Sequence, residues 1–252
     1  MRYVAQFSCG AASAVATKLI LSESDNVIIV NAFLVEEHPD NRRFLADCEK
    51  WFSHPVTVLR DETYGASTDE VWRRKRYIKG PNGAPCSSEL KRKLLRKIMK
   101  PGDISVFGFT REEEDRFSNL QDLYPGELFR APLIEEGLDK GDCLAIVERA
   151  GLRIPVMYEM GYDNANCLGC PKGGQSYWQA IRADFPHRFE AVKKIQEEIG
   201  EGAYFLQHRS GPREGERMSL AELPPGPGKR GGELNFSCSF FCQFAEEKIA
   251  GE

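Results

Sequence analysis

Hydrophobic and polar positions along the first 150 residues alternate between a pattern typical of strands and one typical of helices. Short, mostly apolar runs predict strands at residues 2–8, 26–34, 55–61, 103–109 and 127–134. The run at 26–34 is apolar almost throughout, as expected of a parallel strand that is covered on both faces. Because strands that alternate with helices form right-handed βαβ units, the pattern predicts an α/β fold. We expect a Rossmann-like, open, mainly parallel sheet of five strands.

Helix patterns fill the segments between and after these runs. Helices are predicted at residues 9–24, 38–52, 87–99, 140–151, 174–185 and 188–200. After about Pro155 the strand–helix alternation stops, and a Pro/Gly-rich loop follows at 224–232. We therefore predict an α/β domain at residues 1–154. Residues 155–252 are predicted to form a helical appendage with a mobile, cysteine-containing tail.

Charge is distributed unevenly along the chain. The formal net charge is −4, which argues against bulk binding of nucleic acid. Residues 73–100, however, contain eleven basic residues and one acidic residue, Glu89. Such a segment could attract phosphate groups, sulfate groups or a nucleic-acid backbone. A solvated helix face is the alternative interpretation.

Neither a membrane span nor a secretory signal is indicated. No apolar run is long enough to cross a bilayer, and the N-terminal MRYVAQFSCG is too short for a signal peptide. We expect a cytoplasmic protein without a membrane partner. Since that compartment is reducing, the eight cysteines favour metal binding or redox chemistry over a disulfide framework.

The turn FSCGAASAV follows the first predicted strand. In an open parallel sheet, ligands bind at the carboxyl ends of the strands, near the point where the strand order reverses. Small residues let the backbone approach a phosphate, and the helix behind the turn adds N–H donors and the positive end of its dipole. A tight turn without a ligand is the alternative. The candidate phosphate-binding residues are Ser8, Cys9, Gly10, Ala11, Ala12 and Ser13.

This turn resembles the phosphate loop, often written S-G-G-x-D-S, of the ATP-pyrophosphatase (PP-loop) and phosphoadenosine-phosphosulfate (PAPS) reductase superfamily. Ser8, Gly10 and Ser13 match the loop, whereas Cys9 replaces a glycine and Ala12 replaces the aspartate. The resemblance continues through VNAFLVEEHPDNRRFLADCEKWF, PCSSELKRKLLRKIM, FGFTREEEDRF and NCLGCPKGGQSYWQAIRADFP, and covers most of residues 1–190. It implies an adenine-nucleotide α-hydrolase-like (HUP-type) domain at residues 1–154.

Position 12 bears on the activity that the resemblance implies. In adenylating members of the superfamily the aspartate helps to handle metal and pyrophosphate during ATP cleavage, and the sulfonucleotide reductases lack it. Ala12 therefore favours the reductase branch.

The cysteines divide into core candidates and functional candidates. Cys48 and Cys143 fall on apolar helical faces and are interpreted as core residues. Cys9 is either a small loop residue or a thiol near the ligand, and we favour the former. Cys167 and Cys170 form a C-x-x-C pair whose spacing lets both thiolates reach one metal site.

A metal site needs further ligands from elsewhere in the chain. Cys86 precedes the basic helix, where a thiolate gains from the helix N-terminus. The predicted ligand set is Cys86, Cys167, Cys170 and Cys242, with Cys238 as the alternative fourth ligand. Such a set suits a [4Fe–4S] cluster, with zinc or no metal as alternatives.

The tail cysteines have a competing interpretation as catalytic thiols. Sulfonucleotide reductases, which this chain resembles, use a cysteine near the C-terminus that attacks the sulfur of the substrate. The enzyme thiosulfonate is then reduced by a thiol donor such as a thioredoxin-like protein. On this interpretation Cys238 or Cys242 is the catalytic residue.

Further candidates lie within and after the second predicted strand and after the fourth, on the same edge of the sheet as the loop. They are Asn31, Phe33, Glu36, Glu37, His38, Arg111 and Arg116. Arginine suits phosphate and sulfate because its fork binds them in a bidentate way. The alternatives are a helix cap for His38 and a surface ion pair with Glu112 or Glu113 for Arg116.

Three hypotheses for function follow. The favoured one is a PAPS or APS reductase-like enzyme that releases sulfite from adenylyl phosphosulfate. The second is an ATP-dependent sulfurtransferase that acts on nucleic acid, which the basic segment at 73–100 would help to bind. The third is a nucleotide-binding regulator with a structural metal site.

Overall fold

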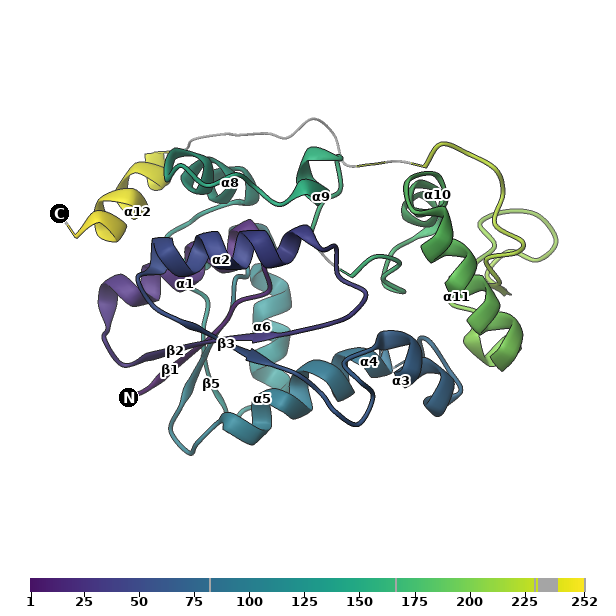
Figure 1. The fold of residues 1–252 in the computed structure, drawn as a ribbon, viewed down its shortest axis with the longest axis horizontal. Coiled ribbons are helices and arrows are strands. Elements are labelled where there is room, and N and C mark those ends of the chain that lie inside the picture. Colours follow the sequence, from purple (N-terminus) through teal and green to yellow (C-terminus); the bar gives the residue numbers. More distant parts are fainter. Residues whose placement is uncertain (82, 166, 229, 231–239, 252) are drawn as a thin grey trace.

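A five-stranded, all-parallel sheet forms the centre of the molecule, as the sequence predicted (Figure 1). The structure, a computed structural model, describes residues 1–81, 83–165, 167–228, 230 and 240–251. The strand order is β3-β2-β1-β4-β5. The strands are β1 (Tyr3–Gln6), β2 (Val27–Ala32), β3 (Val56–Leu59), β4 (Ile104–Val106) and β5 (Leu128–Arg130).

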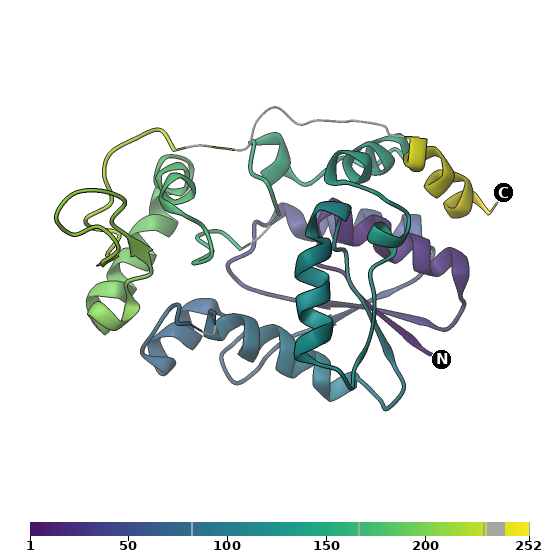
Figure 2. The same cartoon turned by 180° about the vertical axis from the view of Figure 1, so that it is seen from behind.

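The strand order reverses between β1 and β4, which pair side by side in the middle of the sheet. Helices α1 (Ala11–Glu23) and α2 (Asp40–Phe52) lie on one face of the sheet, and α5 (Lys93–Ile98) and α6 (Glu114–Leu123) lie on the other (Figures 1 and 2). A doubly wound sheet of this kind leaves a crevice at the carboxyl ends of β1 and β4.

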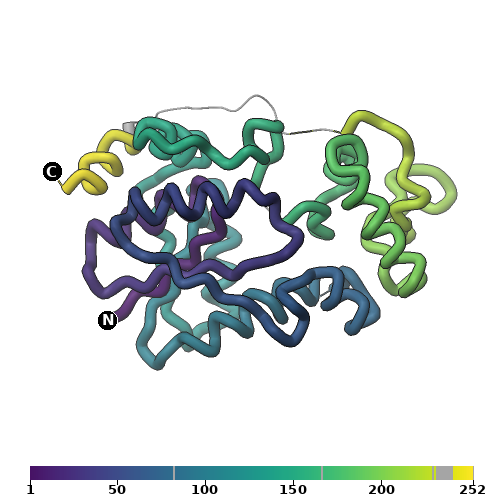
Figure 3. The backbone as a smooth tube through the Cα atoms, viewed as in Figure 1, coloured from purple at the N-terminus to yellow at the C-terminus, as the bar shows by residue number. Residues whose placement is uncertain are grey.

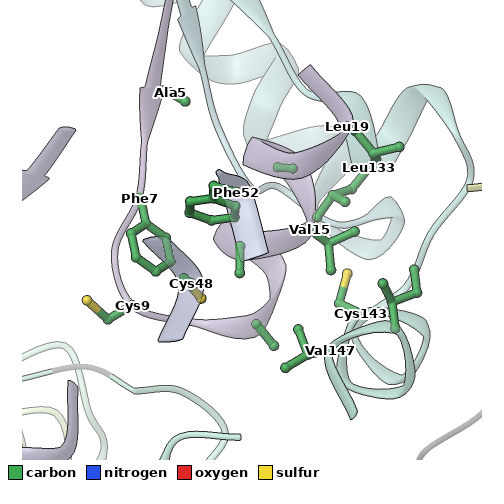
Figure 4. Close-up of a cluster of buried hydrophobic side chains, with 14 of the residues drawn as sticks. Ala5, Phe7, Cys9, Val15, Leu19, Cys48, Phe52, Leu133, Cys143 and Val147 are labelled. Atoms are coloured by element: carbon green, nitrogen blue, oxygen red, sulfur yellow. The ribbon is translucent and has the colours of Figure 1, made fainter. Parts of the chain in front are cut away.

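The main hydrophobic core fills the space between the sheet and α1, α2 and α8 (Lys140–Arg149) (Figure 4). Phe7 from the end of β1 packs against Phe44 and Phe52 of α2, with ring centroids 6.2 and 5.5 Å apart. Burying an aromatic or aliphatic side chain of this size stabilises the fold by roughly 1.5–3 kcal/mol. Cys48 and Cys143 are fully buried in this core, which confirms their interpretation as packing residues.

The predicted basic helix at 87–99 is present, but it is composite. It begins with α4 (Pro85–Ser87), continues through a π-helical turn at Ser88–Arg92 and ends as α5. Single π-helical turns inside helices occur often at functional sites, because they turn side chains away from the regular helical pattern. A helix that the sequence analysis did not predict, α3 (Thr68–Lys75), precedes this segment and is capped by the Ser67 hydroxyl.

The C-terminal third packs around a second hydrophobic core. Helices α10 (Gln175–Asp184) and α11 (Pro186–Ile199) surround Trp178, and a short antiparallel pair, β6 (Leu206–Gln207) and β7 (Arg217–Met218), completes it. The predicted helical appendage therefore also contains strands. Shorter helical segments lie elsewhere at Arg111–Glu113, Pro132–Glu135 (α7), Val156–Glu159 (α9) and Glu201–Ala203.

The last helix, α12 (Phe240–Ala250), does not join the second core. It packs on α1 and α8 of the first core, at the end of the molecule opposite to α10 (Figure 3). Among the residues that the structure describes, no helix is long and apolar enough to cross a membrane.

Candidate functional site

A cavity of about 570 Å³ opens at the carboxyl ends of β1, β2 and β4. Its volume falls within the usual range for small-molecule sites. Ser8, Gly10, Ala12 and Ser13 of the small-residue loop line it together with the first turn of α1. The cavity thus occupies the crevice where doubly wound sheets bind ligands.

Ser13 holds the loop in shape from within the first turn of α1. Its Oγ accepts hydrogen bonds from the backbone N–H groups of Ser8 (3.1 Å) and Gly10 (3.3 Å) and donates to the Gly10 carbonyl (2.9 Å). A Cβ at Gly10 would lie 3.1 Å from the Tyr158 hydroxyl, so the backbone closely approaches that side chain. The start of α1 at this loop provides N–H donors and a positive dipole end suited to a phosphate.

Cys9 is fully buried at the edge of the first core and does not line the cavity, and in Figure 4 its sulfur points away from Cys48 and Phe52. Its φ of 59° lies in the left-handed region, where the superfamily loop has glycine. The Asn31 amide donates to Sγ at 3.4 Å, and burial raises the thiol pKa to about 12. These contacts support the interpretation of Cys9 as a small packing residue, because a protonated, enclosed thiol is a poor nucleophile.

Gly108 after β4 supports the loop from the other side. A Cβ at this position would lie 2.8 Å from both N and Cα of Ser13, closer than backbone atoms allow. Phe107 and Phe109 flank it and line the cavity, with ring centroids 5.6 Å apart.

We expect Gly108→Ala to displace the loop, because the clash is with backbone and not with a flexible side chain. Overpacking of this kind costs about 1–3 kcal/mol, and nucleotide affinity should fall with it. Denaturant unfolding and a nucleotide-binding titration would measure both effects. The matched control is Gly126→Ala, whose Cβ would meet nothing within 4 Å; an equal loss in both variants would contradict the expectation.

The predicted binding residues divide into two groups. Ser8, Gly10, Ala12, Ser13, Asn31, Glu37 and Arg116 line the cavity, whereas Cys9, Ala11, Phe33, Glu36, His38 and Arg111 are absent from its lining. Phe33 lies between the guanidinium groups of Arg42 and Arg60, at 5.0 and 3.7 Å from its ring centroid. His38 Nδ1 accepts from the Asp40 N–H (3.2 Å) at the start of α2, as its interpretation as a cap expected.

Basic and acidic side chains meet around the cavity. Arg116 pairs with Glu113, and Arg111 lies 3.5 Å from Asp139.

Sequence reasoning missed several lining residues, which come from separate segments of the chain: Lys91, Leu95, Phe107, Thr110, Lys140, Tyr158 and Asn164. Burial raises the pKa of Tyr158 to about 12, which keeps its hydroxyl protonated as a hydrogen-bond donor.

Three cysteines lie together beside this cavity: Cys86 in α4, and Cys167 and Cys170 in the C-x-x-C loop. We call them the thiol cluster. Cys167 forms a single antiparallel bridge with Glu37, and the Leu168 N–H donates to the Glu36 carbonyl at 2.8 Å. The end of β2 thereby holds the C-x-x-C loop next to the cavity wall. Cys86 and Cys167 both pack against the small apolar cluster of Leu34, Val71 and Leu90.

Lys91 connects the cavity to the thiol cluster. Its side chain lines the cavity, and it is close enough to Glu37 and the three thiols for their charges to influence its pKa. Burial pushes the pKa of Lys91 down, but Cys167, Glu37, Cys170 and Cys86 outweigh this effect, and the pKa is raised overall. Burial likewise raises the pKa of Glu37, whose carboxylate accepts from Arg42 at 2.9 Å. Lys91 is therefore a charged group positioned between the two parts of the site.

Other basic residues of the 73–100 segment are largely neutralised by neighbours. Arg73 pairs with Glu198 at 2.8 Å, and Lys93 pairs with Glu89 at 2.6 Å. Lys97 and Lys100 remain exposed on and beyond α5. Much of this segment thus fits the interpretation as a solvated face, whereas Lys91, in the π-helical turn, lines the cavity.

The side chains of the thiol cluster are of the type that thiophilic metals bind. The Trp72 indole Nε1 is buried, and among the described residues no acceptor lies within hydrogen-bonding distance of it. It lies against Cys86, where it opposes the rise in the thiol pKa that burial causes. Thiolates held by a metal would provide this N–H with an acceptor, and Lys91 would offset part of their charge. In the described ranges, however, no three His, Cys, Asp or Glu side chains converge closely enough to form a metal-binding group.

Cys242 lies apart from the thiol cluster. It is fully buried in α12, where Arg149 Nη2 donates to its Sγ at 2.5 Å and the Asp142 carbonyl lies 4.0 Å away. It belongs to the first core, and it does not line the cavity. The predicted set of four cysteines is therefore not brought together by this structure. Cys238, the other tail candidate, lies outside the described residues.

Comparison of the chain with models of known protein families finds no match, and comparison with curated protein sequences also finds none. The interpretation of the site therefore depends on its own geometry and chemistry.

Proposed function

We propose that the chain is an enzyme of the HUP type that binds an adenine nucleotide in the cavity and reduces adenylyl phosphosulfate (PAPS or APS) to sulfite. The observation that carries the proposal is the position of Lys91, which lines the nucleotide-sized cavity close enough to three thiols for them to influence its pKa. The start of α1 would hold a phosphate, and the thiol cluster would lie beside the reacting end of the substrate.

The first step of the proposed reaction needs no redox partner. A cysteine thiolate attacks the sulfur of the phosphosulfate, so that an S–S bond forms while the bond from sulfur to the phosphate oxygen breaks. The adenosine phosphate leaves with that electron pair. The α1 N-terminus and Lys91 are suited to stabilise the leaving charge. A dithiol donor, such as a thioredoxin-like protein, then reduces the enzyme thiosulfonate, and sulfite is released as the donor becomes a disulfide.

Cys238 is the proposed attacking thiol, because Cys242 is enclosed in the first core. Cys86, Cys167 and Cys170 would hold a [4Fe–4S] cluster, or alternatively zinc, with a fourth ligand from outside the thiol cluster. When bound, such a group supplies a fixed electrostatic field beside the substrate. Half-buried thiols outside any disulfide suit a reducing compartment, and we place the protein in the cytoplasm within this proposal.

An ATP-dependent sulfurtransferase acting on nucleic acid is the second candidate. The observation in its favour is that Cys242 lies in the first core, so the described residues place three cysteines and not four in the thiol cluster beside the cavity. Three thiolates leave one position of a metal cluster open to carry sulfur. Exposed Lys97 and Lys100 could contact a nucleic-acid backbone. Ala12 argues against it, because the aspartate that handles pyrophosphate is missing.

The test is an anaerobic assay with PAPS or APS and a thioredoxin-like donor, in which sulfite release is expected. Cys238→Ser should lower the rate by about three orders of magnitude or more, as loss of a nucleophile does. The same protein given ATP and RNA or DNA should release little pyrophosphate. Robust pyrophosphate release that depends on nucleic acid, without sulfite, would reject the reductase and support the sulfurtransferase.

A further inference from the structure

Tyr158 of α9 brings its hydroxyl to the small-residue loop from a distant part of the chain. The residue is only 3% exposed, belongs to the first core and lines the cavity. A Cβ at Gly10 would lie 3.1 Å from the hydroxyl oxygen. The hydroxyl therefore lies over the start of α1, on the side of the loop that a side chain at position 10 would occupy.

Two serine hydroxyls lie around the same point. The Cβ position at Gly10 is 3.8 Å from Ser8 Oγ and 4.0 Å from Ser13 Oγ, and these two oxygens are 3.1 Å apart. Both serines line the cavity. Three hydroxyls thus surround the space that the missing side chain of Gly10 leaves open. Hydroxyl donors beside a helix N-terminus are well suited to an oxyanion.

Contacts with α2 fix the position of Tyr158. The Val156 N–H at the start of α9 donates to the Asp40 carboxylate at 2.9 Å. Arg43 donates to both oxygens of this carboxylate at 2.8 Å and to the Ile154 carbonyl at 3.0 Å. A hydroxyl held by such contacts does not have to be reoriented when a ligand binds, which is the property of a preorganised donor.

The surroundings of the hydroxyl favour donation to an anion. Among the described residues, no oxygen atom accepts a hydrogen bond from the Tyr158 hydroxyl, so its proton is available to a ligand. Lys140 also lines the cavity, and its ammonium group lies 5.7 Å from the centroid of the Tyr158 ring. A positive charge at this distance attracts an anion to the same wall of the cavity.

We propose that Tyr158 binds the 5′-phosphate of the nucleotide by donating a hydrogen bond to an oxygen of the phosphate that the start of α1 holds. The inference deepens the proposed function and rests on it for the identity of the ligand. In the proposed reaction this phosphate takes the electron pair of the broken bond from oxygen to sulfur. The hydrogen bond therefore strengthens as negative charge grows on the leaving group, which lowers the barrier.

The experiment compares Tyr158→Phe with the unchanged protein by calorimetric titration of the full chain with AMP and with adenosine, which lacks the phosphate. Phenylalanine keeps the ring in the first core and removes only the hydroxyl. AMP affinity should fall about 10- to 100-fold, the usual effect of losing a hydrogen bond to a charged group. Adenosine affinity should stay the same, because adenosine has no phosphate to lose the contact.

Tyr162→Phe is the matched control. Tyr162 is also buried, but its hydroxyl donates to Asp184 at 2.8 Å and it is absent from the cavity lining. This variant should keep the affinity for AMP. If the Tyr158 hydroxyl has only a structural role at the start of α1, Tyr158→Phe loses stability but keeps its AMP affinity, and that result would overturn the proposal.

Gly10→Ala provides a second test if Tyr158→Phe fails to fold. The φ of −105° at Gly10 is open to any residue, and the new Cβ would be crowded only by the Tyr158 hydroxyl at 3.1 Å. It would fill the space between the three hydroxyls, so AMP affinity should fall while adenosine affinity is kept. Undiminished AMP affinity in folded Gly10→Ala would also overturn the proposal.

The outcomes distinguish this inference from the proposed function. If Tyr158→Phe weakens AMP binding but neither APS nor PAPS yields sulfite, the phosphate contact stands and the reductase fails. If the unchanged protein releases sulfite and Tyr158→Phe binds AMP as tightly as before, the reductase stands and the role of Tyr158 fails. If the unchanged protein binds no AMP, the cavity is not a nucleotide site and both fail.

Discussion

Replacing Cys167 with serine is expected to strip iron or zinc from anaerobically prepared protein, whereas replacing Cys242 with serine is expected to leave the metal bound. Cys167 belongs to the thiol cluster. Lys91 and Trp72 lie next to this cluster. Cys242 lies in the first core and contacts Arg149. Metal and sulfide analysis with a visible spectrum would measure the difference. Because metal binding contributes to folding free energy, the Cys167→Ser variant should also unfold more readily.

The Cys242→Ser variant is the matched control, since it makes the same chemical change at another buried cysteine. Its stability should change little, because a serine hydroxyl at this position has the Arg149 guanidinium and the Asp142 carbonyl as hydrogen-bond partners. Loss of metal from this variant, with retention in Cys167→Ser, would contradict the site described here and favour the set of four cysteines that includes Cys242.

The strands of the sheet could be predicted because the apolar pattern of each strand reflects which of its faces are buried. The run NVIIVNAFL has to be covered on both faces, and in the structure β2 lies between β1 and β3. The ends of the strands and helices were less well predicted. The run at 127–134 gave only three residues of strand, β5, because Pro132 begins the helical turn α7. Helix α3 was missed although Ser67, Asp69 and Glu70 are a typical helix start.

The association of Cys86 with the C-x-x-C pair was reached from chemistry, since both are thiols outside apolar helical faces. The position of Cys242 could not be reached in this way. Whether a cysteine in a tail reaches the site or packs in a core depends on where the chain returns, and no local pattern in FSCSFFCQF encodes that α12 packs on α8. Tertiary contacts between distant segments decide such placements.

Lys91 was not predicted as a residue of the site, for a different reason. In a segment with eleven basic residues, the residue type alone does not distinguish an inward-facing lysine from its exposed neighbours. A signal did exist, because Lys91 and Leu95 are one helical turn apart and both line the cavity. The sequence alone could not show that this helix would lie against the cavity at the ends of β1 and β4.

Lys91→Met is expected to lower the rate of sulfite release by about 10²- to 10³-fold, the usual cost of removing one group that stabilises charge in a transition state. Methionine keeps most of the side-chain volume and removes the ammonium that links the cavity to the thiol cluster. Stability should change little, because Glu37 keeps its hydrogen bond from Arg42 at 2.9 Å. Steady-state kinetics and thermal unfolding would measure the two effects.

Lys93→Met provides the comparison for Lys91→Met within the same helix. Lys93 is exposed and pairs with Glu89 at the surface, where ion pairs contribute little, so its loss should leave the rate nearly unchanged. If the lower rate of Lys91→Met came from weaker long-range attraction of an anionic substrate, both variants would slow the reaction. Added salt would then reduce their difference from the unchanged protein. If Lys91 acts inside the site, its defect should persist at saturating substrate and high salt. Equal defects in the two variants would show that Lys91 has no special role between the cavity and the thiols.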